Sequence, residues 1–353
     1  MRFPQATSAL LAALLFGVST PLAKLLVGEV PPLLLAGLLY LGSGLGLATL
    51  LAARQVVARQ QGIEAVAGIP RREVPWLLGA ILFGGVLGPA LLMAGLTRTS
   101  AASASLLLNV EGALTAVIAW VVFKENADRQ SVLGMVTIVI GGALLSWEPG
   151  SAAFSTGALL IIGACLCWAI DNNLTRKVST NDAMLVAALK GLLAGTCNTG
   201  LALAYGATIP PLVSLASSLL LGFFAYGLSL TLFVVGLRTL GTARTGAYFS
   251  VAPLFGVIVS LAIWPAVPSN LFWAASALMA LGVWLHIRER HEHVHSHEPL
   301  DHSHRHRHDE HHQHEHDFPW AGDEPHVHPH RHGVLTHAHP HYPDIHHRHL
   351  HPH

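Results

Sequence analysis

Histidine is absent from the first 285 residues of this chain of 353, and charged residues make up only 11% of the whole. Basic and acidic residues balance at 20 each, so no global basic field points to nucleic acid as a partner. The charge is unevenly placed, because residues 1–287 hold 14 lysines and arginines and nine acidic residues, whereas residues 288–353 hold six and 11. This division predicts a membrane body followed by an aqueous tail.

Cysteine is scarce as well. The three cysteines, Cys165, Cys167 and Cys197, lie in apolar segments, which excludes a secreted type of disulfide framework. They are interpreted as small buried hydrophobic residues. The body contains no H-E-x-x-H sequence, which excludes an intramembrane metalloprotease.

The body is rich in apolar runs of about twenty residues, the length that a bilayer requires of a spanning helix. Nine further runs follow the first, so the first is interpreted as a span and not as a cleaved signal peptide. Gly42, Gly44 and Gly46 of "GSGLGLA" (42–48) predict close helix packing, because no strand precedes them as one would precede a phosphate-binding loop. The chain is predicted to be an all-α membrane protein, with ten transmembrane helices near residues 8–28, 32–53, 75–96, 100–123, 131–147, 156–175, 183–205, 212–236, 242–264 and 269–287.

The cations between these spans predict their direction, because loops rich in lysine and arginine stay in the cytoplasm. Thirteen such residues fall on one side of the predicted membrane, and Arg98 alone falls on the other. Both termini and the tail are therefore expected on the cytoplasmic side of a cytoplasmic (inner) membrane. The thirteen are Arg2, Arg54, Arg59, Arg71, Arg72, Lys124, Arg129, Arg176, Lys177, Arg238, Arg244, Arg288 and Arg290.

The body contains an internal duplication. A shift of 141 positions pairs Gly95 with Gly236 and Val110 with Val251, and a shift of 152 pairs Phe16 with Trp168. Each copy has five predicted spans, an odd number, so the second copy enters the membrane in the opposite direction, as in transporters that work by alternating access. The predicted domains are a first five-helix repeat at 1–148, a second at 149–287 and the tail at 288–353.

The two halves resemble tandem repeats of the EamA family in the drug/metabolite transporter superfamily. The resemblance covers residues 8–287 and rests on a first span of small and aromatic residues ("LLFGVSTPLAKLL", "LCWAIDNNLTRK") and on "TSAASASLLLNVEGALTAVIAWVVFKE" followed by "GMVTIVIGGALL". It implies a ten-helix permease that moves small organic solutes, often outward, with no bound cofactor and no enzymatic activity. Two departures are Glu111-Gly112, where the second copy has Ala252-Pro253, and the absence of a match for Lys124-Glu125 in the second copy.

Ionisable side chains deep in a span are candidates for function, since each costs roughly 2.5–3.5 kcal/mol on insertion scales. Glu111 is expected to couple protons or to pair with a cationic substrate, the alternative being a buried acid with a structural role. Asp171 is expected to line the cavity or to pair with Arg176. Lys190 balances Glu111 or Asp171, or reaches the headgroups. The candidate substrate or coupling residues are Glu111, Asn109, Asp171, Asn172, Lys190, Tyr248 and Ser250.

All 25 histidines of the chain lie between His286 and His353, and neutral imidazole is the commonest protein ligand for zinc and suits nickel and copper. Residues two apart in an extended chain face the same side, so H-x-H-x-H presents a row of ligands. Frequent prolines and few apolar residues predict a disordered tail that binds a divalent metal, zinc, nickel or cobalt. The candidate ligands are His302, His304, His306, His308, His311, His312, His314, His316, His326, His328, His330, His337, His339 and His341.

The sequence thus predicts a secondary permease that exports a small metabolite and carries a cytosolic metal-binding tail. One alternative is an exporter of nickel, cobalt or zinc, for which Cys167, Asp171 and Glu111 would form a sparse site in the body. A second is a membrane-anchored metal buffer or sensor. The expected partners are the lipid bilayer, a small-molecule or cation substrate and divalent metal, and homodimer formation is left open.

Overall fold

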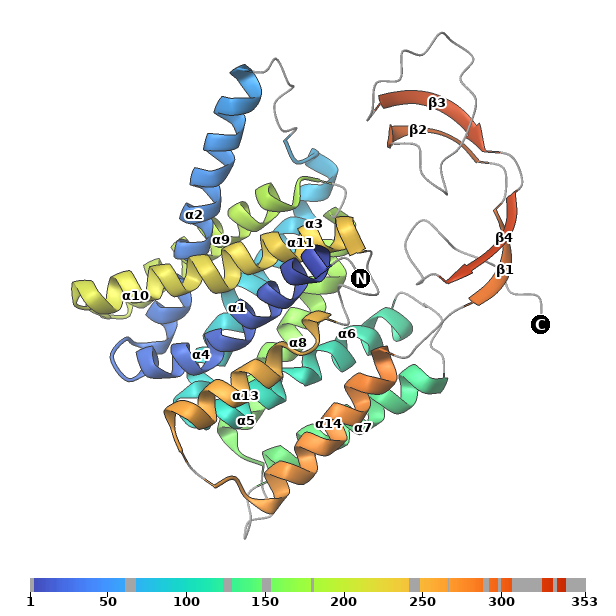
Figure 1. Ribbon diagram of the computed structural model, residues 1–353. Helices are drawn as coiled ribbons and strands as arrows, with labels where there is room; N and C mark the ends of the chain where they lie inside the picture. The colour runs from blue at the N-terminus through green and yellow to red at the C-terminus, as the bar shows by residue number, and fades with distance from the viewer. Residues whose placement is uncertain are drawn as a thin grey trace. The chain divides into compact units, whose positions relative to one another are not determined.

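A computed structural model describes the chain over residues 3–60, 68–122, 129–147, 154–178, 181–240, 248–265, 267–287, 292–297, 300–306, 326–332 and 335–340. The chain divides into two compact units, Met1–Glu289 and Arg290–His353. The first unit is helical and the second contains short strands (Figure 1).

The first half of the helical unit contains two long helices followed by several broken ones. A π-helical segment, η2, interrupts the third stretch, and the fourth stretch is interrupted at Leu108. The elements are α1 (Phe3–Val27), α2 (Pro32–Gln60), η1 (Arg71–Glu73), α3 (Val74–Ala80), η2 (Ile81–Leu87), α4 (Gly88–Leu96), α5 (Ala101–Leu107), α6 (Asn109–Val121) and α7 (Arg129–Ser146).

The second half repeats this order of elements. A second π-helical segment, η4, again interrupts the third stretch, and turn residues Ser250 and Val251 precede α13. The elements are α8 (Thr156–Thr175), η3 (Arg176–Val178), α9 (Ala183–Ala204), α10 (Leu212–Gly222), η4 (Phe223–Leu228), α11 (Ser229–Leu240), α13 (Ala252–Ile263) and α14 (Asn270–Ile287).

The helices have the length and composition of membrane spans. Within the described residues, seven helical stretches are long and apolar enough to cross a bilayer, and three shorter apolar helices accompany them. The seven are Thr7–Val27, Pro32–Gln60, Arg71–Leu96, Ala101–Val121, Thr156–Thr175, Ala183–Ala204 and Leu212–Phe233, and the shorter ones are Val132–Ser146, Ala252–Ile263 and Asn270–Leu285. Each overlaps a span predicted from the sequence, and the chain is a multi-pass membrane protein.

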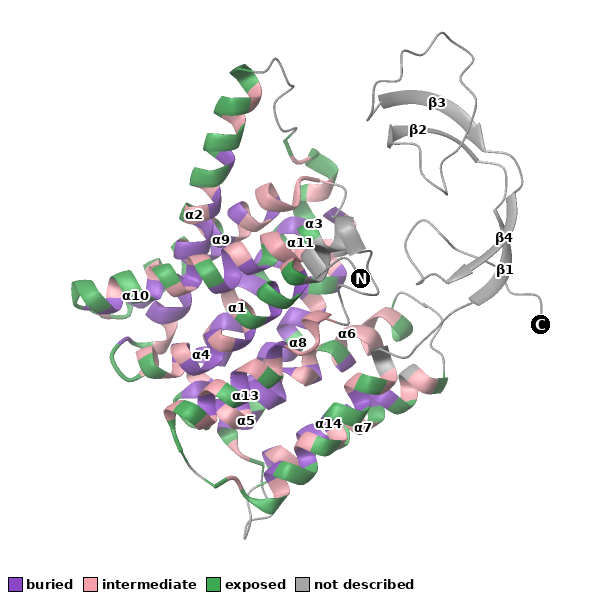
Figure 2. Ribbon diagram, viewed as in Figure 1, coloured by how far each residue is buried: buried purple, intermediate pink, exposed green. Residues whose placement is uncertain are grey.

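Helices of the two halves pack on each other in a reciprocal pattern. The second stretches pair as α2 with α9, and the fifth as α7 with α14. The first stretch of each half lies on the third of the other, since α1 contacts η4 and α11 while α8 contacts α3, η2 and α4. Buried residues line these contacts, and exposed ones cover the outer surfaces of the helices (Figure 2).

Glycines permit the closest of these contacts, as the sequence predicted. Gly44 of α2 lies against the backbone of Gly191 and Leu192 in α9, so that a Cβ at Gly44 would overlap those atoms. Gly42 likewise touches the backbone of Leu219 in α10. Small residues let helix backbones approach within membranes, where packing and hydrogen bonds replace the hydrophobic drive.

The π-helical segment η2 directs backbone oxygens toward neighbouring helices. The Gly84 carbonyl accepts hydrogen bonds from the Tyr40 hydroxyl at 2.7 Å and from the Trp168 indole N–H at 2.9 Å. The Asn198 amide donates to the Gly85 and Val86 carbonyls at 3.3 and 3.1 Å. A π-helical turn leaves free some carbonyls that would accept backbone hydrogen bonds in a regular α-helix. Side chains from α2, α8 and α9 therefore donate hydrogen bonds to the backbone of η2.

Four segments of the tail are described, and each is a short strand. Strand β1 (Glu292–His297) pairs antiparallel with β4 (Leu335–Pro340), and β2 (Leu300–His306) pairs antiparallel with β3 (His326–His332). Histidine recurs at every second position in these segments, and valine, threonine and leucine lie among the residues around it. This two-residue period is that of a β-strand. The prediction of a disordered tail that binds metal stays a prediction.

Candidate functional site

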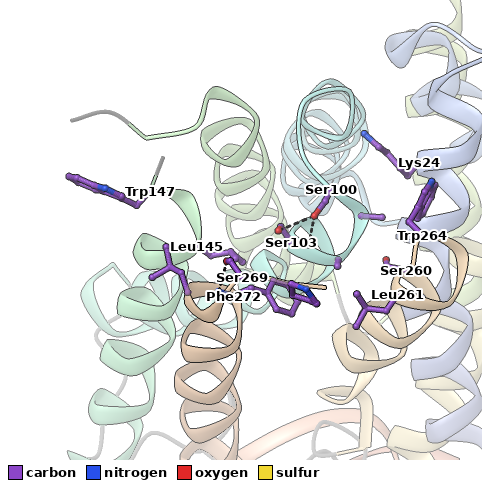
Figure 3. A pocket seen from close by; sticks show the side chains of 14 residues that line it. Lys24, Ser100, Ser103, Leu145, Trp147, Ser260, Leu261, Trp264, Ser269 and Phe272 are labelled. Carbon is purple, nitrogen blue, oxygen red and sulfur yellow. Dashed lines mark hydrogen bonds between the residues drawn. The ribbon is translucent and has the colours of Figure 1, made fainter. Parts of the chain in front are cut away.

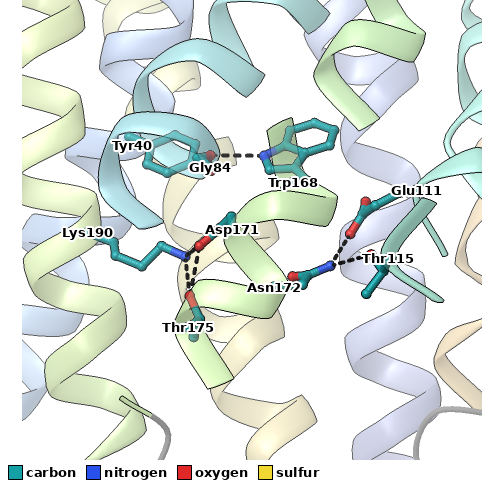
Figure 4. Close-up of polar contacts among 9 residues, drawn as sticks. All are labelled: Tyr40, Gly84, Glu111, Thr115, Trp168, Asp171, Asn172, Thr175 and Lys190. Atoms are coloured by element: carbon teal, nitrogen blue, oxygen red, sulfur yellow. Dashed lines mark hydrogen bonds and ion pairs between the residues drawn. The ribbon is translucent and has the colours of Figure 1, made fainter. Parts of the chain in front are cut away.

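Two polar clusters surround α8 within the helical unit (Figure 4). In the first, the Lys190 ammonium of α9 lies 2.6 Å from each carboxylate oxygen of Asp171. The Thr175 hydroxyl donates to the same carboxylate at 2.7 Å, and Asp171 is only 6% exposed. The cluster is a buried ion pair, closed by a hydroxyl one helical turn further along α8.

The second cluster joins α8 to α6. The Asn172 side-chain amide donates to Glu111 Oε1 at 2.9 Å and lies 3.3 Å from Thr115 Oγ1. Glu111 is half-buried and Asn172 is exposed. Glu111 stands ten residues from each end of the span Ala101–Val121, so this carboxyl group lies at the middle of a membrane-spanning stretch. Its partner is a neutral amide, while the nearby ammonium of Lys190 is engaged by Asp171.

The two clusters point to different sides of one helix because Asp171 and Asn172 are consecutive, about 100° apart around α8. Asp171 is held against η2, where a Cβ on Gly84 would overlap its carboxylate. One turn earlier on α8, Trp168 donates to that same glycine's carbonyl. The backbone of η2 therefore fixes the height and rotation of α8, and with them the position of Asn172 opposite Glu111.

The structure assigns partners that the sequence left open. Asp171 pairs with Lys190. The side chain of Arg176, the other partner predicted for Asp171, lies outside the described residues. Lys190 balances Asp171 and not Glu111. Asn109 donates to the Leu106 carbonyl at 2.9 Å, capping the helix break at Leu108, which is a backbone role. The bonds that define the two clusters involve neither Tyr248 nor Ser250, which are half-buried just before α13.

The helical unit offers no metal centre among the residues whose side chains the structure describes. No three histidine, cysteine, aspartate or glutamate side chains come together there. The sparse site of Cys167, Asp171 and Glu111 is therefore not formed. Cys165 and Cys167 are buried as expected, whereas Cys197 is exposed, contrary to the expectation.

The histidines proposed as ligands are only partly described. Eight of them lie in strands: His302, His304, His306, His326, His328, His330, His337 and His339. His308, His311, His312, His314, His316 and His341 lie outside the described residues.

An ion pair lies at one end of the helical bundle. Arg54 of α2 donates to Asp182 at 2.5 Å, and Asp182 caps α9 by accepting from the Leu185 amide at 3.1 Å. Burial alone would raise the pKa of Asp182, but the hydrogen bonds from Arg54 and from the backbone outweigh it and hold that pKa below its usual value. The pair links α2 to α9 at the end where α9 begins.

A cavity of about 430 Å³ opens at the other end of the bundle (Figure 3). It lies where α1, α7 and α13 end and where α5 and α14 begin. Lys24 is its charged lining residue, and the sequence analysis gave this lysine no role. A charged residue four positions from the end of the predicted first span was the available signal.

Known proteins resemble this chain over most of its length. It is 28% identical over 270 residues to a protein of Methanothermobacter thermautotrophicus named "uncharacterized transporter", a match that covers 72% of this chain and 78% of the other. It is 23% identical over 246 residues to a protein of Streptantibioticus cattleyicolor named "probable terminal-alkyne amino-acid exporter", covering 69% and 83%. A solved crystal structure shares the fold at a TM-score of 0.57 and 19% identity, over 81% of this chain and 97% of its own.

The profile of one protein family matches the chain twice, over residues 5–147 and 155–288. Together the two matches cover well over half of the chain. This multi-pass membrane protein therefore belongs to the EamA-like transporter family.

Proposed function

We propose that this chain is a secondary permease that exports a small organic solute by alternating access, with Glu111 as its coupling carboxylate. The observation that carries the proposal is the contact of Glu111 with Asn172 at the middle of a spanning stretch. Among the described residues, the carboxylate of Glu111 is held by a neutral amide and forms no ion pair. Binding of a proton, or of the cationic group of a substrate, would stabilise the Glu111 carboxylate within the membrane. Either event would couple the charge of Glu111 to transport.

Alternating access requires two halves that exchange roles, and we propose ten spans arranged as two inverted five-helix repeats. The reciprocal packing of the two halves supports this arrangement. The π-helical segments support it as well, because adding 141 to the bounds 81 and 87 of η2 gives 222 and 228, and η4 is Phe223–Leu228. A shared irregularity at one aligned position is expected of a duplicated unit, since a π-helical turn is rare and often marks a functional site.

Two observations support a substrate class. One relative carries the name of an amino-acid exporter, and the helical unit offers polar groups without a metal centre among its described side chains. We therefore propose a small organic metabolite of the amino-acid type as cargo. The proposed membrane is the cytoplasmic one, with both termini inside, as the thirteen-to-one distribution of cations supports.

The test is flux in everted vesicles that contain the full chain. Amino acids, nickel, cobalt and zinc are supplied with and without a proton gradient. Glu111→Gln should abolish organic-solute uptake, because the amide can hydrogen-bond but cannot change charge. Glu111→Asp should retain part of it, since the shorter acid still exchanges a proton. Full uptake by Glu111→Gln would contradict the proposal.

Glu73 supplies a matched control. It accepts a hydrogen bond from the Asn181 amide at 2.6 Å, the same pairing as Glu111 with Asn172, but it lies in η1, at the very start of the third spanning stretch Arg71–Leu96. Glu73→Gln removes an equal charge at the end of the bundle, and flux should persist. Uptake of nickel, cobalt or zinc that requires Glu111 would instead identify metal as cargo. A cellular metal phenotype that survives neutralisation of both Glu111 and Asp171 would identify a buffer.

We also propose that the tail binds divalent metal. Antiparallel pairing sets His302, His304 and His306 of β2 opposite His330, His328 and His326 of β3. Strands β1 and β4 likewise set His293 opposite His339 and His295 opposite His337. Because alternate residues share one face of a strand, this register assigns the six histidines of β2 and β3 to a single face. Imidazoles so arranged suit nickel, cobalt and zinc.

The tail is tested by equilibrium dialysis of nickel, cobalt and zinc against the full chain and against a chain ending at residue 287. The full chain should bind several ions at pH 7.5 and lose them at pH 5.5, because histidine titrates near 6.5 and binds metal when neutral. The shortened chain should bind none. Equal binding by both chains would contradict a role of the tail.

A further inference from the structure

The cavity at the end of the bundle opposite the Arg54–Asp182 pair has the features of a ligand site. Its volume of about 430 Å³ falls within the range usual for small-molecule pockets, roughly 300–1,000 Å³. Five helices contribute to its wall, so it is a feature of the assembled bundle and not of one loop. It lies apart from Glu111, Asn172, Asp171 and Lys190, none of which lines it.

The charge of the cavity is positive. Lys24 is the charged residue in its described lining, which contains no carboxylate. The ammonium also donates to the Leu96 carbonyl at the end of α4. Helix C-termini favour cations, and because an ammonium has three donors, this contact leaves donors for a ligand. The cavity therefore favours an anion.

Hydroxyl groups supplement the ammonium. Ser260 of α13 lines the cavity, is only 2% exposed, and its Oγ has no hydrogen-bond partner in the described structure. A buried hydroxyl without a partner costs about 1–3 kcal/mol, which a ligand oxygen would recover. Ser100 and Ser103, at the start of α5, add a hydroxyl pair 3.0 Å apart.

The remaining wall is apolar and aromatic. Trp264, Leu261 and Phe272 line it, and Figure 3 shows Lys24 and Trp264 on one side with Leu145 and Ser269 on the other. A polar anion such as sulfate would leave these surfaces unused. A carboxylate on a short apolar body would use both the ammonium and the aromatic wall.

We propose that this cavity binds small organic acids, including amino acids, by an ion pair between the substrate carboxylate and Lys24. The inference rests on the proposed function in that it names the substrate class of the export path. It assigns the cavity to the release side of the membrane, where the carboxylate is held after leaving the middle of the bundle.

Binding can be measured without transport. The full chain is purified in detergent, and equilibrium dialysis compares labelled hexanoate, norleucine and hexanamide. The two carboxylates should bind at least tenfold more tightly than the neutral amide of equal size, because a charge-assisted hydrogen bond is stronger than a neutral one. Equal affinity of hexanoate and hexanamide would overturn the proposal, and this comparison needs no variant.

Variants assign the effect to Lys24. Lys24→Met should weaken hexanoate binding at least tenfold and leave hexanamide unchanged, and Lys24→Arg should restore most of the affinity. Arg98→Gln is the matched control, because Arg98 is an exposed cation at the same end of the bundle that does not line the cavity. An equal loss in Arg98→Gln and Lys24→Met would indicate general surface attraction and overturn the site.

Failure of this inference and failure of the proposed function are distinguishable. Glu111→Gln should stop flux but leave hexanoate binding intact, since Glu111 lies outside the cavity. Binding that depends on Lys24 without Glu111-dependent flux would refute the coupling role and preserve the site. Flux that depends on Glu111 without Lys24-dependent binding would refute the site and preserve the coupling role.

Discussion

Lys190 of α9 holds both carboxylate oxygens of Asp171 at 2.6 Å, and the two side chains are 17% and 8% exposed. The pair joins α8 to α9, two different spans of the second half. Because its two charges compensate each other within the membrane body, it differs from Glu111, whose partner is an amide. The Lys190–Asp171 pair therefore stabilises the fold, whereas the carboxylate of Glu111 is available to bind a proton or a substrate.

Neutralising one member of this pair should destabilise the protein more than neutralising both. Asp171→Asn or Lys190→Met leaves a buried charge without its partner, which typically costs about 3–5 kcal/mol, whereas removing both charges avoids that penalty. The measurement is the melting temperature of the purified protein, followed by size-exclusion chromatography after heating. The double variant should melt above either single variant, and additive losses would contradict the compensation of the two charges.

Gly84→Ala should displace α8 from η2. The added Cβ would overlap the carboxylate of Asp171, and overpacking of this kind usually costs about 1–3 kcal/mol. Gly200→Ala in α9 is the control, because nothing lies within 4 Å of a Cβ there and alanine favours a helix by roughly 0.5–1 kcal/mol. Thermal melting should separate the two variants in opposite directions, and an unchanged melt of Gly84→Ala would refute the close contact.

The Arg54–Asp182 pair predicts a loss of stability in acid. The pKa of Asp182 is lowered in the folded protein, so its stabilisation is present above the unfolded value of about 3.9 and is lost as the pH falls through the lower folded value. Asp182→Asn retains an oxygen for the Leu185 amide and removes the charge. Since Arg54 is 43% exposed, we expect a loss below about 1 kcal/mol near neutral pH.

Melting temperatures between pH 7 and pH 3 would check this prediction. The variant should lose less stability than the parent as the pH falls through the folded pKa of Asp182. An identical acid slope for both proteins would show that the aspartate charge contributes nothing.

Much of the fold was predictable because apolar run length is a property of single segments. Each predicted span overlaps a helix of the structure, since bilayer thickness and chain breakers are local signals. The breaks were not predictable from these signals. The segments η2 and η4 are as apolar as their flanks, and the carbonyls of η2 accept hydrogen bonds from side chains of other helices, such as Asn198.

The residues of the candidate site were predictable from the sequence, but which of them contact each other was not. Insertion cost alone selected Glu111, Asp171 and Lys190. The pairing of Lys190 with Asp171 depends on the rotation of α8 against α9, which the sequence leaves open. Lys24 was missed because its position near the end of a span allows snorkelling, and the cavity beside it is formed by five separate helices.

The direction of the chain in the membrane gives a further prediction. A cysteine at Arg98, exposed between α4 and α5, should react with an impermeant maleimide added to intact cells, whereas a cysteine at Arg72, exposed in η1, should react only after permeabilisation. The physical reason is the thirteen-to-one distribution of cations, which favours retention of the Arg72 side in the cytoplasm. Cys197→Ser provides the background, because Cys197 is the exposed native cysteine among those described. The reverse pattern would place the histidine tail outside the cell, where it could not respond to cytosolic metal, and would move the Lys24 cavity from the release side to the entry side.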